Sequence, residues 1–400
     1  MAQNQDGRGT YGPVPMRMLG TNQSGVRDHN ERLVLSILRR DGALAKADIA
    51  RRTGLSAQTI SVIMRALEED GMLLRDAPRR GKVGQPSVPM RLNPDGAYFF
   101  GGMIGRRWTE LVLVDMTGTI RSHERIFYDY PVFDEVLEFL QAAADRITAG
   151  LSLRERARLS GFGVALPYNI WDWAEEIDAP VDALLAWRDR DIGAELGART
   201  GFEVLIQNDA SAACAAELVF GQAGTLPEDF LHIFVGFFVG GGLVIGNHLF
   251  AGRTGNAGAV GSLPIPQPDG TTRQLIDLAS LYGLAEVLIA EGRSIEELWK
   301  LRPEDWAGIR PEVQRWIKCA APALAQAILS TVALLDVGCV LIDGHLPDEV
   351  RTELVAAVDT AVAASDFAGL RRPQIRAGTL GAESRSLGAA SLPLAARFLV

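Results

Sequence analysis

The hydrophobic positions divide the chain into two parts near residue 92. In the first part apolar residues recur with helical spacing, and Leu33, Val34, Ile37 and Leu38 form one stripe along a helix. In the second part short apolar runs bounded by glycine alternate with longer helical patterns, which is typical of α/β structure. The sequence therefore predicts a small helical module followed by a large α/β body.

Two more helices are predicted in the small module. One runs from about Lys46 to Thr53, and its start has no Ser, Thr, Asp or Asn at the expected N-cap position. Gly54 makes a turn, and Ser56 then has the position of an N-cap for the next helix. Two helices around a short glycine-containing turn have the spacing of a helix-turn-helix.

The third helix is predicted to bury Ile60, Ile63, Met64 and Leu67. Its opposite face carries short hydrogen-bonding groups near its start and an arginine a turn later, as a recognition helix needs in order to read base edges in the major groove. The predicted DNA-contacting residues of this part are Ser56, Gln58, Thr59, Ser61 and Arg65. A helical corner inside a core is the alternative.

A wing is predicted after the third helix. Residues 72–74 and 88–92 have strand patterns, and a basic loop joins them. Arg79, Arg80 and Lys82 would neutralise phosphates, and Gln85 would enter a minor groove. The winged helix-turn-helix that results has double-stranded DNA as its predicted partner.

The large body shows two successive units of strand, hairpin and helix, which predict two α/β lobes with a cleft between them. The predicted strands are 98–104, 109–115, 120–128, 159–166, 204–207, 231–239, 242–246, 340–343 and 375–377, and the predicted helices are 133–149, 210–220, 311–335, 348–363 and 386–398.

Charge separates the same two parts. Residues 26–91 hold 13 Arg or Lys against 8 Asp or Glu, whereas the net charge of the 400-residue chain is −9. A basic module on an acidic body indicates a polyanion partner for the module alone, although a solvated charged surface is the alternative. An apolar content of 48% fits a globular protein, and three scattered cysteines fit a reducing cytoplasm.

No membrane segment or secretory signal is expected. The most apolar stretch, residues 231–246, is short for a membrane helix, contains five glycines and fits two buried strands better. The first residues contain no apolar run. We therefore expect a cytoplasmic protein without a membrane partner.

Several motifs of the body resemble those of the ROK family (repressors, open reading frames and sugar kinases), specifically its members with an amino-terminal winged helix. They are Gly161-Phe162-Gly163-Val164-Ala165-Leu166-Pro167, Gln207-Asn208-Asp209-Ala210, Gly236-Phe237-Phe238-Val239-Gly240-Gly241-Gly242, Gly252-Arg253-Thr254-Gly255-Asn256-Ala257-Gly258 and Gly378-Thr379-Leu380-Gly381-Ala382-Glu383. The resemblance implies an α/β fold of two ribonuclease-H-like (actin/hexokinase-like) lobes, which clasp a sugar and, in the kinase members, ATP.

The expected domain organisation follows from these patterns. Residues 1–25 are predicted to be a flexible tail, 26–91 the winged helix-turn-helix, and 92–400 the effector domain. Within that domain, lobe 1 is expected at about 96–212 together with the carboxy-terminal helix 385–400, and lobe 2 at about 213–384.

The resemblance also implies where a sugar would bind. The retained polar candidates are Asn208, Asp209, Arg253, Asn256 and Ser262. Asp209 matches the catalytic base of the kinase members and is the one retained candidate for that role, although it or Asn208 could simply cap the following helix. Trp171 and Trp173 either reach the mouth of the cleft or pack within a lobe.

The other parts that phosphoryl transfer requires are altered. Where kinases of the family carry an Asp before Gly-Gly-Thr, this chain has Met103, and where they have Gly-Thr-Gly it has Phe237 and Phe238 after Gly236. The sugar-side Glu-x-Gly-His appears as residues 259–262 without the acid or the histidine. We therefore expect no cofactor and the loss of kinase activity.

No metal site is predicted from the sequence. The cysteine cluster that binds zinc in many members of the family is absent. His232, His248 and His345 show no ligand spacing, and each is predicted to be structural or on the surface.

The predicted function is a homodimeric DNA-binding transcriptional regulator, a repressor, controlled by a sugar or sugar derivative in a degenerate kinase cleft. Two alternatives stay open. One is an active sugar kinase with a DNA-binding head, and the other is a scaffold whose winged helix binds protein.

Overall fold

The computed structural model describes residues 23–78, 87–222, 226–293 and 303–400. The chain begins with three helices, α1 (Gln23–Asp41), α2 (Lys46–Thr53) and α3 (Ala57–Glu69). An antiparallel pair follows, β1 (Leu73–Arg75) and β2 (Met90–Leu92). This is the predicted winged helix-turn-helix. The predicted tail, 1–25, lies outside the described residues except for its last three, which already belong to α1.

The N-terminal ends of α2 and α3 are stabilised in different ways. Ser56 caps α3, since its side chain accepts a hydrogen bond from the Thr59 backbone N–H. The residue at the N-cap of α2, Ala45, makes no such bond, as the sequence predicts. Leu44 just before it forms an antiparallel bridge with Met90, with both backbone hydrogen bonds present. A strand contact therefore fixes the start of α2 in place of a cap.

The chain folds into two compact units. Among the described residues, unit 1 comprises 23–78, 87–212, 222, 226 and 386–400, and unit 2 comprises 213–221, 227–293 and 303–385. Unit 1 contains a five-stranded sheet in the order β5-β4-β3-β6-β7. Its strands are β3 (Tyr98–Ile104), β4 (Trp108–Asp115), β5 (Ile120–Phe127), β6 (Leu159–Leu166) and β7 (Val204–Asn208), and its helices are α4 (Phe133–Gly150), α5 (Leu153–Arg156), α6 (Val181–Asp189) and α7 (Ile192–Thr200).

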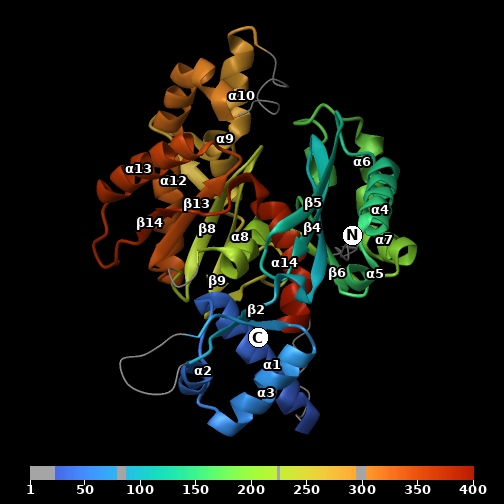
Figure 1. Ribbon diagram of the computed structural model, residues 1–400. Helices are drawn as coiled ribbons and strands as arrows, with labels where there is room; N and C mark the ends of the chain where they lie inside the picture. The colour runs from blue at the N-terminus through green and yellow to red at the C-terminus, as the bar shows by residue number, and fades with distance from the viewer. Residues whose placement is uncertain (1–22, 79–86, 223–225, 294–302) are drawn as a thin grey trace, which may run out of the picture. The chain divides into compact units, whose positions relative to one another are not determined.

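Neighbouring glycines of β3 show which helix covers each face of this sheet. A side chain at Gly101 would collide with the backbone of α14 (Ser384–Phe398), and one at Gly102 would meet Leu140 of α4. Because successive residues of a strand point to opposite faces, α14 and α4 lie on opposite sides of the sheet (Figure 1). The missing side chains let the α14 backbone approach β3 closely.

Unit 2 contains a second five-stranded sheet, in the order β10-β9-β8-β13-β14. Counted from the first strand of each, both sheets have the order 3-2-1-4-5, with two antiparallel and two parallel pairings. This repeat confirms the predicted pair of α/β lobes. The strands are β8 (Phe230–Val235), β9 (Val239–Ile245), β10 (His248–Leu249), β13 (Cys339–Gly344) and β14 (Gln374–Ala377).

The remaining elements of unit 2 are a small ribbon and helices. The ribbon pairs β11 (Pro264–Pro266) with β12 (Thr272–Gln274). The helices are α9 (Leu275–Ala279), α10 (Leu281–Ala290), α12 (Arg310–Leu335) and α13 (Asp348–Ala363). Helix α8 (Asp209–Phe220) starts in unit 1 and ends in unit 2.

The turn of the first hairpin in unit 2 differs from its predicted place. The sequence predicts strands over 231–239 and 242–246, with the turn at the glycines between them. The structure instead turns at residues 236–238, and Gly240–Gly242 lie within β9, opposite β8. The rings of Phe237 and Phe238 pack against each other and against Tyr282, which moves the turn ahead of the glycines.

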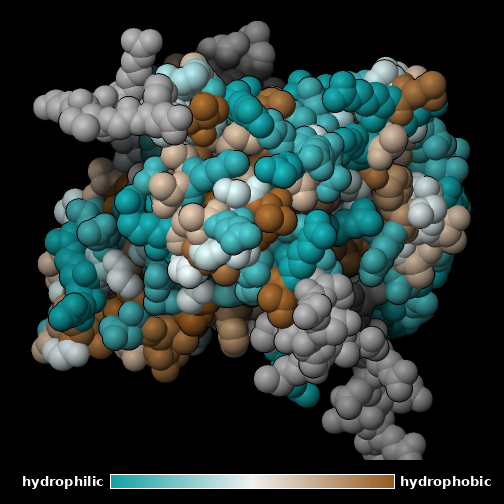
Figure 2. Space-filling view, turned by 60° about the horizontal axis from the view of Figure 1, so that its bottom comes forward, coloured by the Kyte–Doolittle hydropathy of each residue, from teal (hydrophilic) through white to brown (hydrophobic). Residues whose placement is uncertain are grey.

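One described helix is long and apolar enough to span a membrane by length and composition alone. It covers residues 305–335, and 56% of its most apolar window is buried inside the protein. A core helix of a globular domain has the same properties. On the face that Figure 2 shows, hydrophobic residues are interspersed among hydrophilic ones.

Helix α1 is attached to the body of unit 1 at two places. The Arg32 Nε donates to the Leu399 carbonyl at 2.6 Å, and the Val400 N–H donates to the Ser36 hydroxyl at 3.0 Å. The Arg39 guanidinium donates to the Met116 carbonyl at 2.6 Å, and burial lowers the pKa of Arg39 to about 10. The residues after α14 thus bind the first helix of the winged helix-turn-helix.

Helices α14 and α8 cross so closely at Gly388 that we expect any added side chain there to destabilise the fold. A Cβ at Gly388 would lie 1.9 Å from the Ala212 carbonyl oxygen. Gly388→Ala should therefore lower the midpoint of denaturant unfolding, at a cost of about 1–3 kcal/mol for overpacking. Gly150→Ala is the matched control, since nothing lies within 4 Å of its Cβ position. An unchanged or raised midpoint for Gly388→Ala would contradict this packing.

Candidate functional site

The outward face of α3 carries the predicted base-reading residues. Gln58 and Arg65 are exposed, and their side chains have no hydrogen bond to another described residue. Ile60, Ile63, Met64 and Leu67 are buried on the other face, as predicted. Two of the predicted DNA contacts also have a structural role, because the Ser56 and Thr59 hydroxyls lie 2.8 Å apart at the helix cap. Ser61 is half-buried.

Val62 adds an apolar group to this face. Its side chain is 59% exposed, between Gln58 and Arg65 along the helix. A branched apolar side chain at this place suits contact with a thymine methyl group in the major groove. The wing residues Arg79, Arg80, Lys82 and Gln85 lie outside the described residues.

The first pair of sugar-site candidates lies where β7 meets α8. Asn208 is buried, and its side-chain oxygen accepts from the backbone N–H groups of Ala210 and Ser211, both at 3.1 Å. The Asp209 carboxylate accepts from the Ala210 N–H at 2.9 Å. Capping of α8 is therefore one role of this pair, with Asn208 as the deeper cap.

The other three candidates belong to unit 2, within residues 252–262. Arg253 and Ser262 are exposed, and Asn256 is half-buried. The segment bends through Gly252, Gly255 and Gly258, all with positive φ, and a side chain at Gly258 would collide with the backbone of β9. These glycines hold the loop against the sheet and leave the three polar side chains at its surface.

The β8–β9 turn is closed by aromatic rings. The Phe237 and Phe238 ring centroids are 4.8 Å apart, and the Tyr282 centroid is 5.6 Å and 5.7 Å from them. The backbone of the turn is also occupied, since the Val239 N–H donates to the Ser280 hydroxyl at 2.8 Å. The turn and the first residue of β9 therefore pack against the residues that begin α10.

Met103 at the end of β3 and Arg106 in the β3–β4 turn stand where the kinase members of the family are expected to bind phosphate. Met103 is 1% exposed in the core of the sheet, where its thioether cannot face a ligand. The Arg106 guanidinium lies 5.4 Å from the ring centroid of Trp173. Trp173 and Trp171 are both half-buried.

The comparisons with known proteins match both parts of the chain. Residues 101–396 match the model described as "ROK family", and residues 27–73 match that described as "Winged helix-turn-helix DNA-binding". The chain belongs to the ROK family. The predicted resemblance is therefore confirmed, and so is the winged helix-turn-helix ahead of it.

Individual relatives extend over most of the chain. An uncharacterized protein, y4fQ, of Sinorhizobium fredii (strain NBRC 101917 / NGR234) is 28% identical over 91% of this chain and 90% of its own. The xylose repressor of Bacillus subtilis (strain 168) is 24% identical over 61% of this chain and 62% of its own. A crystal structure of a ROK family transcriptional regulator, a homolog of the E. coli MLC protein, has a TM-score of 0.65 at 19% identity and covers 92% of this chain and 96% of its own.

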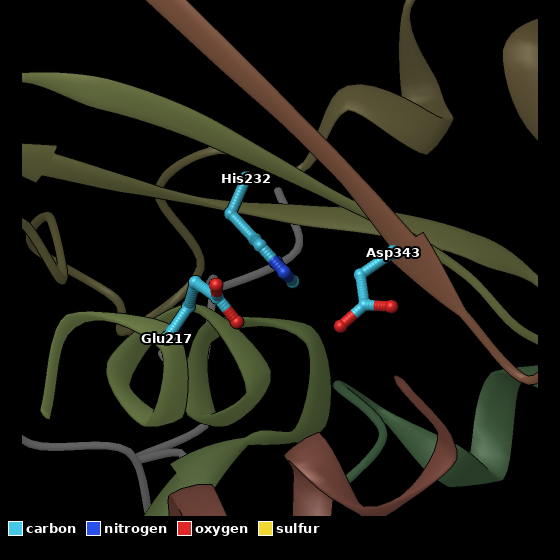
Figure 3. A group of neighbouring side chains, drawn as sticks. All are labelled: Glu217, His232 and Asp343. Carbon is cyan, nitrogen blue, oxygen red and sulfur yellow. The ribbon is translucent and has the colours of Figure 1, made fainter. Parts of the chain in front are cut away.

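One group of polar residues in this ROK protein was missed by sequence analysis. Glu217 of α8, His232 of β8 and Asp343 of β13 are all fully buried and lie together in unit 2 (Figure 3). They are far apart in the sequence, so no ligand spacing reveals them. The signal was a histidine and an aspartate, each inside an otherwise apolar strand.

Base reading by α3 yields a direct test. Arg65→Ala should lose about 1–3 kcal/mol of discrimination between an operator and a scrambled sequence, because a base contact specifies sequence whereas phosphate contacts do not. Arg27→Ala, which removes an exposed arginine of α1, is the matched control. Fluorescence anisotropy with both DNAs measures the ratio of affinities. Equal weakening on the two sequences would remove Arg65 from base reading.

Proposed function

We propose that this protein is a DNA-binding transcriptional repressor that responds to a sugar or sugar derivative. The observation that carries the proposal is the outward face of α3, which leaves Gln58, Val62 and Arg65 exposed on a winged helix-turn-helix. The proposed form is a cytoplasmic homodimer that places two such helices on the half-sites of a double-stranded operator. Arg79, Arg80, Lys82 and Gln85 of the wing are proposed to support them at the backbone and minor groove.

A sugar-like effector is proposed because of the family and the polar groups retained in it. The relatives include a protein named xylose repressor, which supports both a sugar ligand and repression. Asn208, Asp209, Arg253, Asn256 and Ser262 are the proposed sugar contacts. Amide, carboxylate, guanidinium and hydroxyl groups all suit sugar hydroxyls.

Helix α14 offers a physical route from effector to DNA. At its unit 2 end, the Arg385 guanidinium lies 5.0 Å from the ring centroid of Phe234 in β8. Its middle packs on β3 and β6 through contacts that exclude side chains at Gly101, Gly161 and Gly163. The residues after it bind α1. Effector binding that shifts the start of α14 would therefore shift the recognition helix, provided the effector binds one state more tightly.

An active sugar kinase is the second candidate, and Asp209 is the observation that favours it. Its carboxylate lies at the first residue of α8, where the resemblance places a catalytic base. Against a kinase stand the aromatic closure of the β8–β9 turn and the buried Met103 at β3. Phosphoryl transfer needs a metal-holding carboxylate and a phosphate cradle as well as a base.

Turnover separates the two candidates. We expect the full-length protein to release ADP from Mg·ATP no faster than the blank across a panel of monosaccharides, amino sugars and sugar phosphates, measured in a coupled assay. Asp209→Asn is assayed beside it. ADP release that requires a sugar and is lost in Asp209→Asn would overturn the repressor proposal in favour of the kinase.

DNA binding under effector control is the second test. Electrophoretic shifts of the protein on its own upstream DNA should weaken as salt rises, because phosphate contacts release counterions. One sugar of the same panel, with D-xylose tested first, should change the apparent affinity at least about tenfold, which corresponds to about 1.4 kcal/mol. Absence of any shift at both of two salt concentrations would favour the scaffold whose winged helix binds protein.

A further inference from the structure

The buried group in unit 2 has a feature that the repressor function does not explain. His232 is fully buried, and neither of its ring nitrogens has a hydrogen-bond partner among the described residues. A buried polar atom without a hydrogen-bond partner destabilises the folded state, because it has lost its bonds to water. Figure 3 shows the imidazole pointing into the space between Glu217 and Asp343. An isolated polar ring in a strand core would normally be replaced by an apolar one.

The three side chains converge on a common point. One ligand atom from each of Glu217, His232 and Asp343 lies within 4.8 Å of the others. A first-row divalent cation binds imidazole nitrogen and carboxylate oxygen at about 2.0–2.2 Å, so an ion fits between these atoms after small side-chain adjustments. Direct hydrogen bonds between the imidazole and the two carboxylates are absent among the contacts of these described residues.

Each carboxylate is held in place by donors on its outer side. Glu217 accepts from the Thr379 N–H at 3.0 Å and from the Thr379 hydroxyl at 2.8 Å. Asp343 accepts from the Arg351 guanidinium at 3.0 Å and from the Gly381 N–H at 2.9 Å. Such outer donors orient the ligands of a metal and leave their remaining lone pairs free for it.

Charge leads to the same conclusion. Two buried carboxylates face one another with Arg351 as the cation bound to Asp343. The imidazole of His232 lies beside them, and neither of its ring nitrogens has a hydrogen-bond partner among the described residues. A divalent cation would neutralise the excess negative charge and give the imidazole a partner at the same time.

We propose that Glu217, His232 and Asp343 form a buried site for a divalent transition-metal ion such as Zn²⁺ or Mn²⁺. The mixed nitrogen and oxygen ligands favour these ions over Mg²⁺, which prefers oxygen ligands and retains water. The ion would join α8, β8 and β13 and, through Thr379 and Gly381, hold the loop at residues 378–381. It enters as unit 2 folds, because none of its ligands reaches the surface. The proposal does not depend on DNA binding.

The test is refolding of the full-length protein with a defined metal. The protein is unfolded in guanidinium, refolded with EDTA, Zn²⁺, Mn²⁺ or Mg²⁺, desalted, and analysed for metal per chain by mass spectrometry and for Tm. We expect about one Zn²⁺ or Mn²⁺ per chain and a Tm about 5 °C above the EDTA sample, with no gain from Mg²⁺. Metal well below one per chain in every sample would overturn the proposal.

Variants locate the bound ion. His232→Leu should lose both the metal and the Tm gain, and in EDTA it should be at least as stable as the wild type, because it removes an unpartnered buried ring. His248→Leu is the matched control, an exposed histidine on β10 of the same sheet, and should keep one ion. If His232→Leu does not refold, Glu217→Gln provides the same comparison at constant volume. A full metal complement in either cluster variant would contradict the proposed ligands.

Discussion

The close approach of α14 to its neighbours is the constraint on which the rest of unit 1 depends. Added side chains at Gly101, Gly161 and Gly163 would each lie about 2 Å from an atom of α14, and one at Gly388 would lie 1.9 Å from α8. With no side chains between the backbones, α14 has little freedom to slide on the sheet. Any displacement of its start has to move the helix as a body, and its far end is bonded to α1.

This packing explains how a fold of two lobes can serve a DNA-binding head. Helices α8 and α14 each have residues in both units, so each continues from one unit into the other. The β8–β9 turn, where the kinase members of the family carry Gly-Thr-Gly, is filled here by Phe237, Phe238 and Tyr282. The two-sheet fold is thus combined with apolar packing at that turn.

Much of the fold could be predicted from the sequence because local patterns determine it. Helical spacing gave the three helices of the head, Ser56 gave the cap of α3, and the repeated order of apolar runs gave two similar lobes. The β8–β9 turn was misplaced because glycine is a weaker signal than the packing of two phenylalanines on Tyr282. That contact joins residues more than forty positions apart.

The candidate sites also differ in whether local sequence patterns could predict them. The outward face of α3 follows from helical periodicity alone, and the resemblance suggested the sugar-site residues, whose role in binding stays a proposal. The Glu217, His232 and Asp343 cluster could not be predicted, because its members come from three elements and meet only after the sheet of unit 2 has formed. Isolated polar residues inside apolar strands were the one sign of it.

The central claim is that this ROK protein has the two-lobed fold of the family but does not bind nucleoside triphosphate. Isothermal titration of the full-length protein with Mg·ATP, alone and with each monosaccharide, tests it most directly. The closed β8–β9 turn and the buried Met103 predict no saturable heat up to millimolar nucleotide. Saturable binding with a Kd in the micromolar range, tightened by a sugar, would contradict the account.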